Sequence, residues 1–305
     1  MARFAHTLLL TGWLFATPLV LAAENPPTGA MTAGEYLFRV SGCYGCHTDE
    51  KGGGARLAGG HALKTDFGTF YSPNITPDAD TGIGKWSEQD FFRAMREGRS
   101  PAGDNYYPSF PYPSYTKLTD DDLRALWGYL RAQPAVKRAN QPHDLKFFAR
   151  ARSFVGSWKA LYFKPGVVPA DPAKSAAWNR GAYLAEAATH CGECHTPRSA
   201  LGGIKTDRHY AGSRDGPEGS VIPNITPDKK TGIGKWSRGE LATYLESGLM
   251  PDGDSAGDLM AEVIDNGLRY LKKDDMAALA EYVLSLPPVE NAVRKQKKKS
   301  RGEFE

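Results

Sequence analysis

The feature that most constrains this chain is a five-residue motif that occurs twice, first as Cys43-Tyr44-Gly45-Cys46-His47 and again as Cys191-Gly192-Glu193-Cys194-His195. Cys-x-x-Cys-His is the attachment sequence for c-type haem. Its two thiols reach the two vinyl groups of one porphyrin and form thioethers, and the histidine that follows supplies a nitrogen ligand to the iron. The sequence therefore predicts two covalently bound haem c groups, with thioethers at Cys43, Cys46, Cys191 and Cys194 and axial imidazoles from His47 and His195.

Two other kinds of site use Cys-x-x-Cys pairs, namely zinc sites and redox-active dithiols. All 4 cysteines of the 305 residues lie in the two motifs, so none is left for a disulfide or a nucleophile. The two pairs lie much farther apart than the roughly 15–20 residues that separate the pairs of a zinc ribbon. Both pairs are also followed by histidine, which favours haem attachment over either alternative.

The first 23 residues have the pattern of a secretory signal peptide. Arg3 gives a positive start, residues 8–21 form an apolar run, and Ala22-Ala23 offers small residues for cleavage. The run is interrupted by Pro18 and is short for a membrane span, so an uncleaved anchor is the less favoured alternative. Because thioether attachment takes place outside the cytoplasm in bacteria, we expect a periplasmic mature protein.

Composition and charge narrow the class of partner. Hydrophobic residues make up 41% and charged residues 24% of the chain, which is ordinary for a globular protein. The formal net charge of +3 is not the footprint of a nucleic-acid-binding protein. Basic residues are concentrated in the tail, residues 291–305, which is either a solvated segment or an electrostatic arm for peripheral contact with a membrane.

Beyond the haem motifs, longer stretches of the chain also repeat. Asn74-Ile75-Thr76-Pro77-Asp78 returns as Asn224-Ile225-Thr226-Pro227-Asp228, and residues 81–87 return as residues 231–237. Self-similarity of this length indicates a duplicated domain. We therefore predict one domain at residues 24–138 and a second at residues 173–290, joined by residues 139–172.

Each copy contains the signals of three helices. The first helix leads directly into the haem motif, the second is capped by Ser87-x-x-Asp90 or Ser237-x-x-Glu240, and the third spans 120–133 or 274–286. First and last helices that cross over a haem are the class I cytochrome c arrangement, and Gly34 and Gly181 would allow a close crossing. We predict an all-α protein of two tandem class I cytochrome c domains. The linker is rich in aromatic residues, so we expect it to be ordered and to fix the distance between the haems.

The sixth iron ligands are expected to be methionines. In the second copy Met276 belongs to the closing helix and Met250 directly follows the second helix. Met260 is therefore the favoured ligand, in a loop between the second and third helices.

In the first copy, the position 150 residues before Met260 is Phe110, which cannot bind iron. Met95, on the second helix, is the only methionine of that copy after its haem motif, and we assign it as the ligand. A core-packing role for Met95, ligation by His61 and an open iron are the alternatives.

From about residue 33 to residue 289, the chain resembles the dihaem c-type cytochromes related to the cytochrome subunits of membrane-associated alcohol and aldehyde dehydrogenases. The resemblance rests on the two haem motifs and on residues 67–78, 93–95, 110–114, 191–198 and 259–263. It implies that a periplasmic dehydrogenase donates electrons and that a terminal oxidase, a quinone or a soluble cytochrome accepts them, and it supports Met260. Family members often carry methionine where this chain has Phe110. Alcohol dehydrogenase cytochrome subunits are commonly trihaem, whereas a third motif is absent here.

Three functions compete. An electron carrier is favoured, because no nucleophile–base pair or substrate metal site is visible and the cofactor itself supplies the redox chemistry. A dihaem peroxidase-like enzyme with an open first haem is the main alternative. A structural module that uses haem only for folding is the third, and it would exchange electrons with no partner.

Overall fold

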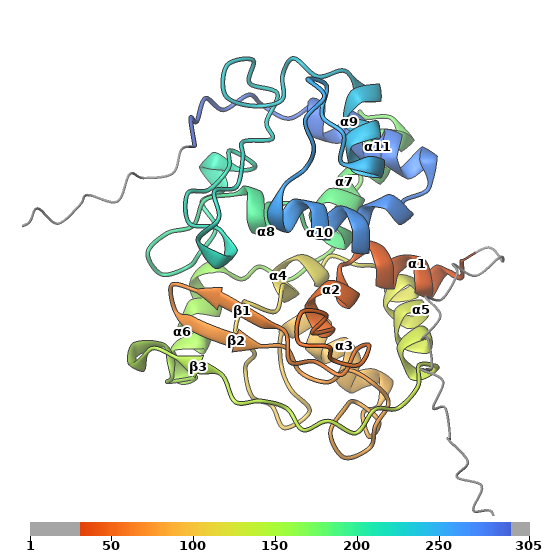
Figure 1. The fold of residues 1–305 in the computed structure, drawn as a ribbon, viewed down its shortest axis with the longest axis vertical. Coiled ribbons are helices and arrows are strands. Elements are labelled where there is room, and N and C mark those ends of the chain that lie inside the picture. The colour runs from red at the N-terminus through yellow and green to blue at the C-terminus, as the bar shows by residue number, and fades with distance from the viewer. Residues whose placement is uncertain (1–30, 294–305) are drawn as a thin grey trace, which may run out of the picture. The chain divides into compact units, whose positions relative to one another are not determined.

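The computed structural model describes residues 31–293. Residues 32–293 all belong to one compact unit, which Figure 1 traces from red to blue. The predicted signal peptide (1–23) and the predicted basic tail (291–305), except its first three residues, lie outside the described residues. Both stay predictions. Within residues 31–293, no helix is both long and apolar enough to cross a membrane.

The first copy contains five helices and two strands: α1 (Ala33–Val40), α2 (Cys43–His47), β1 (Ala62–Thr65), β2 (Gly68–Tyr71), α3 (Glu88–Glu97), α4 (Tyr112–Tyr115) and α5 (Asp120–Arg131). The segment between the copies adds β3 (Asp144–Leu145), the short η1 (Phe147–Ala149) and α6 (Ser153–Tyr162). The second copy consists of α7 (Ala176–Tyr183), η2 (Leu184–Ala188), α8 (Gly192–His195), η3 (Thr206–Arg208), η4 (Pro217–Gly219), α9 (Arg238–Ser247), α10 (Asp258–Asn266), η5 (Leu268–Tyr270) and α11 (Lys273–Leu284).

The second helix of each copy begins at the capping residues that the sequence predicts. Ser87 and Asp90 form a reciprocal capping box before α3, and Ser237 and Glu240 form the same box before α9. These bonds satisfy backbone N–H groups that a helix start would otherwise leave unpaired. Gly98 and Gly248 end the two helices in the left-handed conformation, with φ of 60° and 77°. Glycine adopts that conformation without steric cost.

The first and last helices of each copy cross at a glycine, as predicted. A Cβ atom on Gly34 would overlap the carbonyl oxygen of Ala125 in α5, and one on Gly181 would overlap that of Ala278 in α11. The crossing buries an apolar layer in each copy: Leu37, Phe38, Leu126 and Leu130 in the first, Leu184, Ala185, Leu279 and Val283 in the second. In each copy the haem motif follows shortly after the first of the two crossing helices.

The described chain is mostly helical, in agreement with the predicted all-α class, but it also contains an unpredicted sheet. β1, β2 and β3 form an antiparallel sheet in that order, with Ala62 opposite Tyr71 and Gly68 opposite Leu145. A side chain at Gly68 would overlap the backbone of Asp144, so glycine is required where β3 joins. The strands are only two to four residues long, which is too short for a clear alternating pattern in the sequence.

The two copies contact each other through matching positions. The Tyr36 hydroxyl donates to Asp275 at 2.5 Å, and the Tyr183 hydroxyl donates to Asp122. Tyr36 and Tyr183 each lie two residues after the crossing glycine, and each aspartate is the third residue of the closing helix in the other copy. The contact is therefore reciprocal, like an interface with twofold symmetry. The division into two tandem domains and a linker stays a prediction, because both copies belong to one compact unit.

Candidate haem sites

The two haem motifs adopt the same local geometry. Cys43 to His47 form the short helix α2, and Cys191 is the N-cap residue of α8, which ends at His195. A helical turn places residues three apart on one face, so both thiols of each motif can meet one porphyrin edge. None of the four cysteines forms a disulfide.

A proline carbonyl orients each motif histidine. His47 Nδ1 lies 2.8 Å from the carbonyl oxygen of Pro73, and His195 Nδ1 lies 2.9 Å from that of Pro223. A carbonyl only accepts hydrogen bonds, so Nδ1 carries the proton and Nε2 keeps its lone pair free for a metal. Burial lowers the pKa of both imidazoles, which keeps them neutral as iron ligation requires. The donor set of each motif therefore fits a covalently attached haem.

The thiols have no activated-nucleophile character. Burial raises the pKa of Cys43 to about 12 and that of Cys191 to about 11. A reactive or metal-binding thiolate needs a lowered pKa. The environment of these cysteines therefore fits thioether formation better than a redox dithiol.

An asparagine follows each of these prolines in the sequence, and its hydrogen bonds fix the loop that carries the proline carbonyl. Asn74 Oδ1 accepts from the Thr76 amide at 2.9 Å, and Asn74 Nδ2 donates to the Val136 carbonyl at 2.7 Å. Asn224 makes the same bonds to Thr226 and Val289 at the same distances. Both asparagines are buried. These hydrogen bonds give both asparagines a structural role in the loop that carries the proline.

The two proposed methionine ligands lie on helices. Met95 is on α3 and only 4% exposed; the corresponding residue of the second copy, Leu245 on α9, is 6% exposed. Met260 is the third residue of α10 and is partly exposed. The expected loop position of Met260 is wrong, because a helix that the sequence did not predict forms there. The assignment of both methionines as ligands stays a prediction.

The starts of the two haem motifs are joined by one side chain. His190, which directly precedes Cys191, has a φ of 40°, and its Nε2 donates to the carbonyl oxygen of Ser41 at 3.3 Å. Tyr115 packs edge-on against the His190 ring and donates its hydroxyl to the same carbonyl at 2.7 Å. Ser41 lies two residues before Cys43. Sequence reasoning missed this bridge, for which the only signal was a histidine beside a haem motif.

In the second copy, four donors surround the carboxylate of Glu186, whose side chain is 16% exposed. Glu186 accepts from His209 Nε2 at 2.8 Å and from the hydroxyls of Tyr210 and Tyr282 at 2.9 Å each, and Lys117 of the first copy lies 3.2 Å away. Burial on its own would raise the pKa of Glu186, but His209, Lys117 and the hydroxyl donors lower it to about 2. His209, whose side chain is 35% exposed, is therefore part of this cluster.

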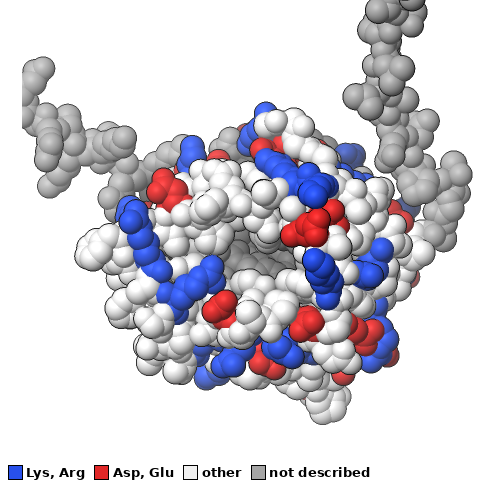
Figure 2. Space-filling view, turned by 90° about the horizontal axis from the view of Figure 1, so that it is seen from below, with Lys and Arg blue, Asp and Glu red and all other residues white. Residues whose placement is uncertain are grey.

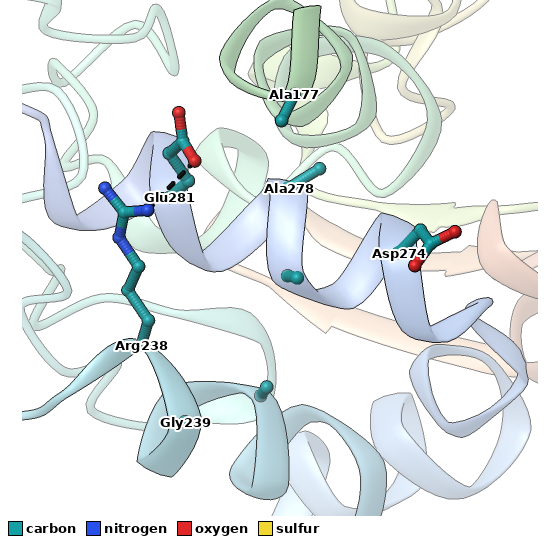
Figure 3. Close-up of a pocket in the computed structure, with 8 residues that line it drawn as sticks. Ala177, Arg238, Gly239, Asp274, Ala278 and Glu281 are labelled. Carbon is teal, nitrogen blue, oxygen red and sulfur yellow. Dashed lines mark hydrogen bonds and ion pairs between the residues drawn. The ribbon is translucent and has the colours of Figure 1, made fainter. Parts of the chain in front are cut away.

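A surface pocket lies apart from the haem motifs. It has a volume of about 430 Å³ and is lined by residues of α7, α9 and α11 that include Ala177, Gly239, Asp274 and Ala278. The ion pair between Arg238 and Glu281, at 3.0 Å, spans it (Figure 3). No motif residue lines this pocket. Within residues 31–293, no group of three or more His, Cys, Asp or Glu side chains is arranged to hold a metal ion.

Comparison with known proteins shows what the chain is similar to. The cytochrome c family profile matches residues 31–134. A dihaem cytochrome c-type protein of Cereibacter sphaeroides is 45% identical over 268 residues, which cover 86% of this chain and 88% of that protein. The gluconate 2-dehydrogenase cytochrome c subunit of Pantoea cypripedii is 37% identical over 275 residues, 87% of this chain and 62% of the subunit. The fructose dehydrogenase cytochrome subunit of Gluconobacter japonicus is 36% identical over 291 residues, 92% of this chain and 59% of the subunit. The chain thus spans less than two thirds of these two dehydrogenase subunits.

Proposed function

The chain belongs to the cytochrome c family, among the dihaem members related to dehydrogenase cytochrome subunits, and on this premise we propose that it carries two haem c groups and transfers electrons from a periplasmic dehydrogenase to the respiratory chain. The observation that carries the proposal is the repeated donor set of two thiols and one imidazole. When bound, haem c supplies one-electron chemistry between ferric and ferrous iron. His47 and His195 are already oriented for it by Pro73 and Pro223.

The remaining residues place and shield the cofactors. The crossings of α1 with α5 and of α7 with α11 bury an apolar layer beside each motif, which would form part of the apolar surroundings of a bound haem. The reciprocal contacts between the copies hold the two motifs at one spacing. Fixed spacing matters because electron tunnelling falls steeply with distance.

We assign Met260 as the sixth ligand of the second haem and Met95 as that of the first. One observation favours a competing function. The position of Met95 is filled in the second copy by Leu245, which is equally buried and cannot bind iron. If Met95 only packs the core, the first iron is open, and a dihaem peroxidase-like enzyme becomes the better proposal.

Paired substitutions separate these two functions. With Met95 as ligand, Met95→Ala turns the first haem high-spin and removes half of the methionine-to-iron charge-transfer band. Leu245→Ala leaves that band intact and lowers only stability. If Met95→Ala changes stability alone, as Leu245→Ala does, and the unmodified protein reacts rapidly with peroxide, the enzyme replaces the carrier. Met260→Ala serves as the matched test of the second haem.

The electron donor and the destination are tested together. We propose that the chain is exported by the signal peptide at residues 1–23, accepts electrons from a dehydrogenase, and passes them to an oxidase, a quinone or a soluble cytochrome. The full chain, produced with the cytochrome c maturation system, is mixed with a periplasmic dehydrogenase and its substrate, and the ferrous absorption bands are followed in a stopped-flow instrument. Reduction that requires both the dehydrogenase and its substrate supports the proposal. A colourless protein, or one iron per chain, contradicts it.

A further inference from the structure

The segment between the two copies exposes an unusual amount of apolar surface. Six of the eight large hydrophobic side chains exposed within residues 31–293 lie on it or beside it. Five of them form what we call the linker patch: Phe147 (85% exposed), Phe148 (51%), Phe154 (65%), Leu161 (67%) and Leu201 (61%). Single exposed apolar residues are normal, but a contiguous group of them marks an interaction site.

The members of the linker patch are contiguous. Phe148 stacks edge-on against both Phe147 and Phe67, with ring centroids 6.3 and 6.2 Å apart. A Cβ atom on Gly202, next to Leu201, would lie 3.3 Å from the Phe67 ring and 4.0 Å from Trp158 Nε1 on α6. Phe154 and Leu161 lie four residues before and three residues after Trp158, on the same face of that helix. In Figure 1, α6, β3 and the β1–β2 hairpin lie together on one side.

The surrounding structure holds this surface in place. Leu145 in β3 and Val155 in α6 are each 5% exposed and anchor the segment. Lys159 Nζ donates to Asn105 Oδ1 at 2.9 Å, and Arg152 donates to the Asn105 carbonyl at the same distance. The segment that carries the exposed rings is therefore fixed to the rest of the protein by buried side chains and hydrogen bonds.

The charge of the segment is one-sided. Residues 145–170 contain five cations and no carboxylate: Lys146, Arg150, Arg152, Lys159 and Lys164. None of the five forms an ion pair with any residue in the 31–293 range. Four exposed carboxylates lie nearby. They are Asp66 at the hairpin, Asp144 in β3, Glu97 near Lys159, and Asp104, which directly precedes Asn105. On the face shown in Figure 2, Lys and Arg lie among Asp and Glu around a central hollow.

We infer that the linker patch is a docking surface for an anionic lipid bilayer. Phe, Trp and Leu side chains enter the boundary between headgroups and acyl chains, while Lys and Arg contact anionic headgroups. A second copy fits less well, because pairing two such surfaces brings the exposed cations of both copies, Lys146, Arg150, Arg152 and Lys164, close together. A protein hot spot requires a pocket on the partner for each protruding ring, whereas a bilayer accepts protruding rings without one. The inference does not depend on haem or on the proposed electron transfer.

Vesicle flotation of the full haem-loaded chain tests the inference. Vesicles of phosphatidylglycerol and phosphatidylethanolamine are compared with vesicles of phosphatidylcholine. Two double variants remove the apolar and the cationic contributions separately. Phe147→Ser with Phe148→Ser removes two exposed rings, and Lys146→Gln with Lys164→Gln removes two cations. Leu249→Ser is the matched control, because Leu249 is 49% exposed but lies in the second copy. All variants keep the same terminal segments, so any lipid binding by the termini cancels in the comparison.

We expect severalfold weaker binding to anionic vesicles for both double variants, unchanged binding for Leu249→Ser, and weak binding of all forms to phosphatidylcholine. Binding should also fall as salt rises. The inference is overturned if the unmodified chain does not bind anionic vesicles. It is also overturned if either double variant binds them as strongly as the unmodified chain. It is equally overturned if the phenylalanine variant abolishes a dimer seen by sedimentation velocity, or a complex with the dehydrogenase, without changing vesicle binding.

Discussion

The contact between Tyr36, Arg180 and Asp275 gives the most direct test of how the copies are held together. Asp275 is 7% exposed and accepts from the Tyr36 hydroxyl at 2.5 Å and from Arg180 Nε and Nη2 at 2.8 and 2.7 Å. A hydrogen bond to a buried charged group contributes about 1.5–3 kcal/mol. The Arg180 side chain is 40% exposed, so water screens its ion pair to about 1 kcal/mol or less. Asp275→Asn should therefore lower the free energy of unfolding by about 2–3 kcal/mol.

Urea unfolding of the haem-loaded protein, followed by circular dichroism, measures this loss as a shift in midpoint at constant slope. Combining Asp275→Asn with Tyr36→Phe in a double-mutant cycle should give a coupling energy above about 0.5 kcal/mol. Asp122→Asn is the matched control. Asp122 receives the equivalent tyrosine, but Ala33 stands where the second copy has Arg180, so its loss should be smaller. Equal losses for the two aspartates, or no coupling with Tyr36, would refute the reasoning.

Three further predictions concern other hydrogen-bonded groups of the structure. The pKa of Glu186 is lowered to about 2 from an ordinary value of 4.5, so the stabilisation by its carboxylate is complete above pH 4.5 and is lost as the pH falls toward 2. In a plot of the urea midpoint against pH, Glu186→Gln should flatten the curve between these two values. An unchanged curve would contradict this role of Glu186. Asn74→Ala should cost about 1–3 kcal/mol in urea unfolding, because the Thr76 amide and the Val136 carbonyl lose partners, and Asn224→Ala should cost a similar amount. His190→Gly should be milder than His190→Ala in the same assay, by about 1 kcal/mol, because both lose the bond to Ser41 but only glycine relieves the positive φ.

The parts of the fold that the sequence predicts are those encoded within a few neighbouring residues. The haem motifs, the two capping boxes and the crossing glycines each depend on residues that are close in sequence or on one backbone position with no room for a Cβ. Their chemistry leaves few alternatives. The cysteine and histidine pattern therefore indicates the two candidate haem sites before any fold is known.

The parts that the sequence does not predict depend on distant contacts. The sheet forms because β3, more than 70 residues after β2, pairs with it at Gly68. The C-terminal end of α10 lies against the first copy, where Asn266 is next to Gly45 of the first haem motif. Glu186 and His209 are 23 residues apart and meet only after η2 and the following loop fold together. Periodicity within one element carries no information on such pairings.

A half-buried cation beside the first haem motif, Arg56, leads to a last prediction, about the reduction potential. The Arg56 guanidinium lies over the rings of Phe38 and Tyr44, 5.3 and 5.6 Å from their centroids, and its Nη2 donates to the Tyr129 hydroxyl at 2.9 Å. No carboxylate in the described chain pairs with it. Nearby positive charge disfavours the more positive ferric state, so Arg56→Gln should lower the potential of the first haem and leave the second nearly unchanged.

A spectroelectrochemical titration measures both potentials, and Lys85→Gln is the control, because the Lys85 side chain is 74% exposed and its charge is screened by water. A potential that does not fall in Arg56→Gln, or that falls equally in Lys85→Gln, would show that the field of Arg56 does not reach the first haem.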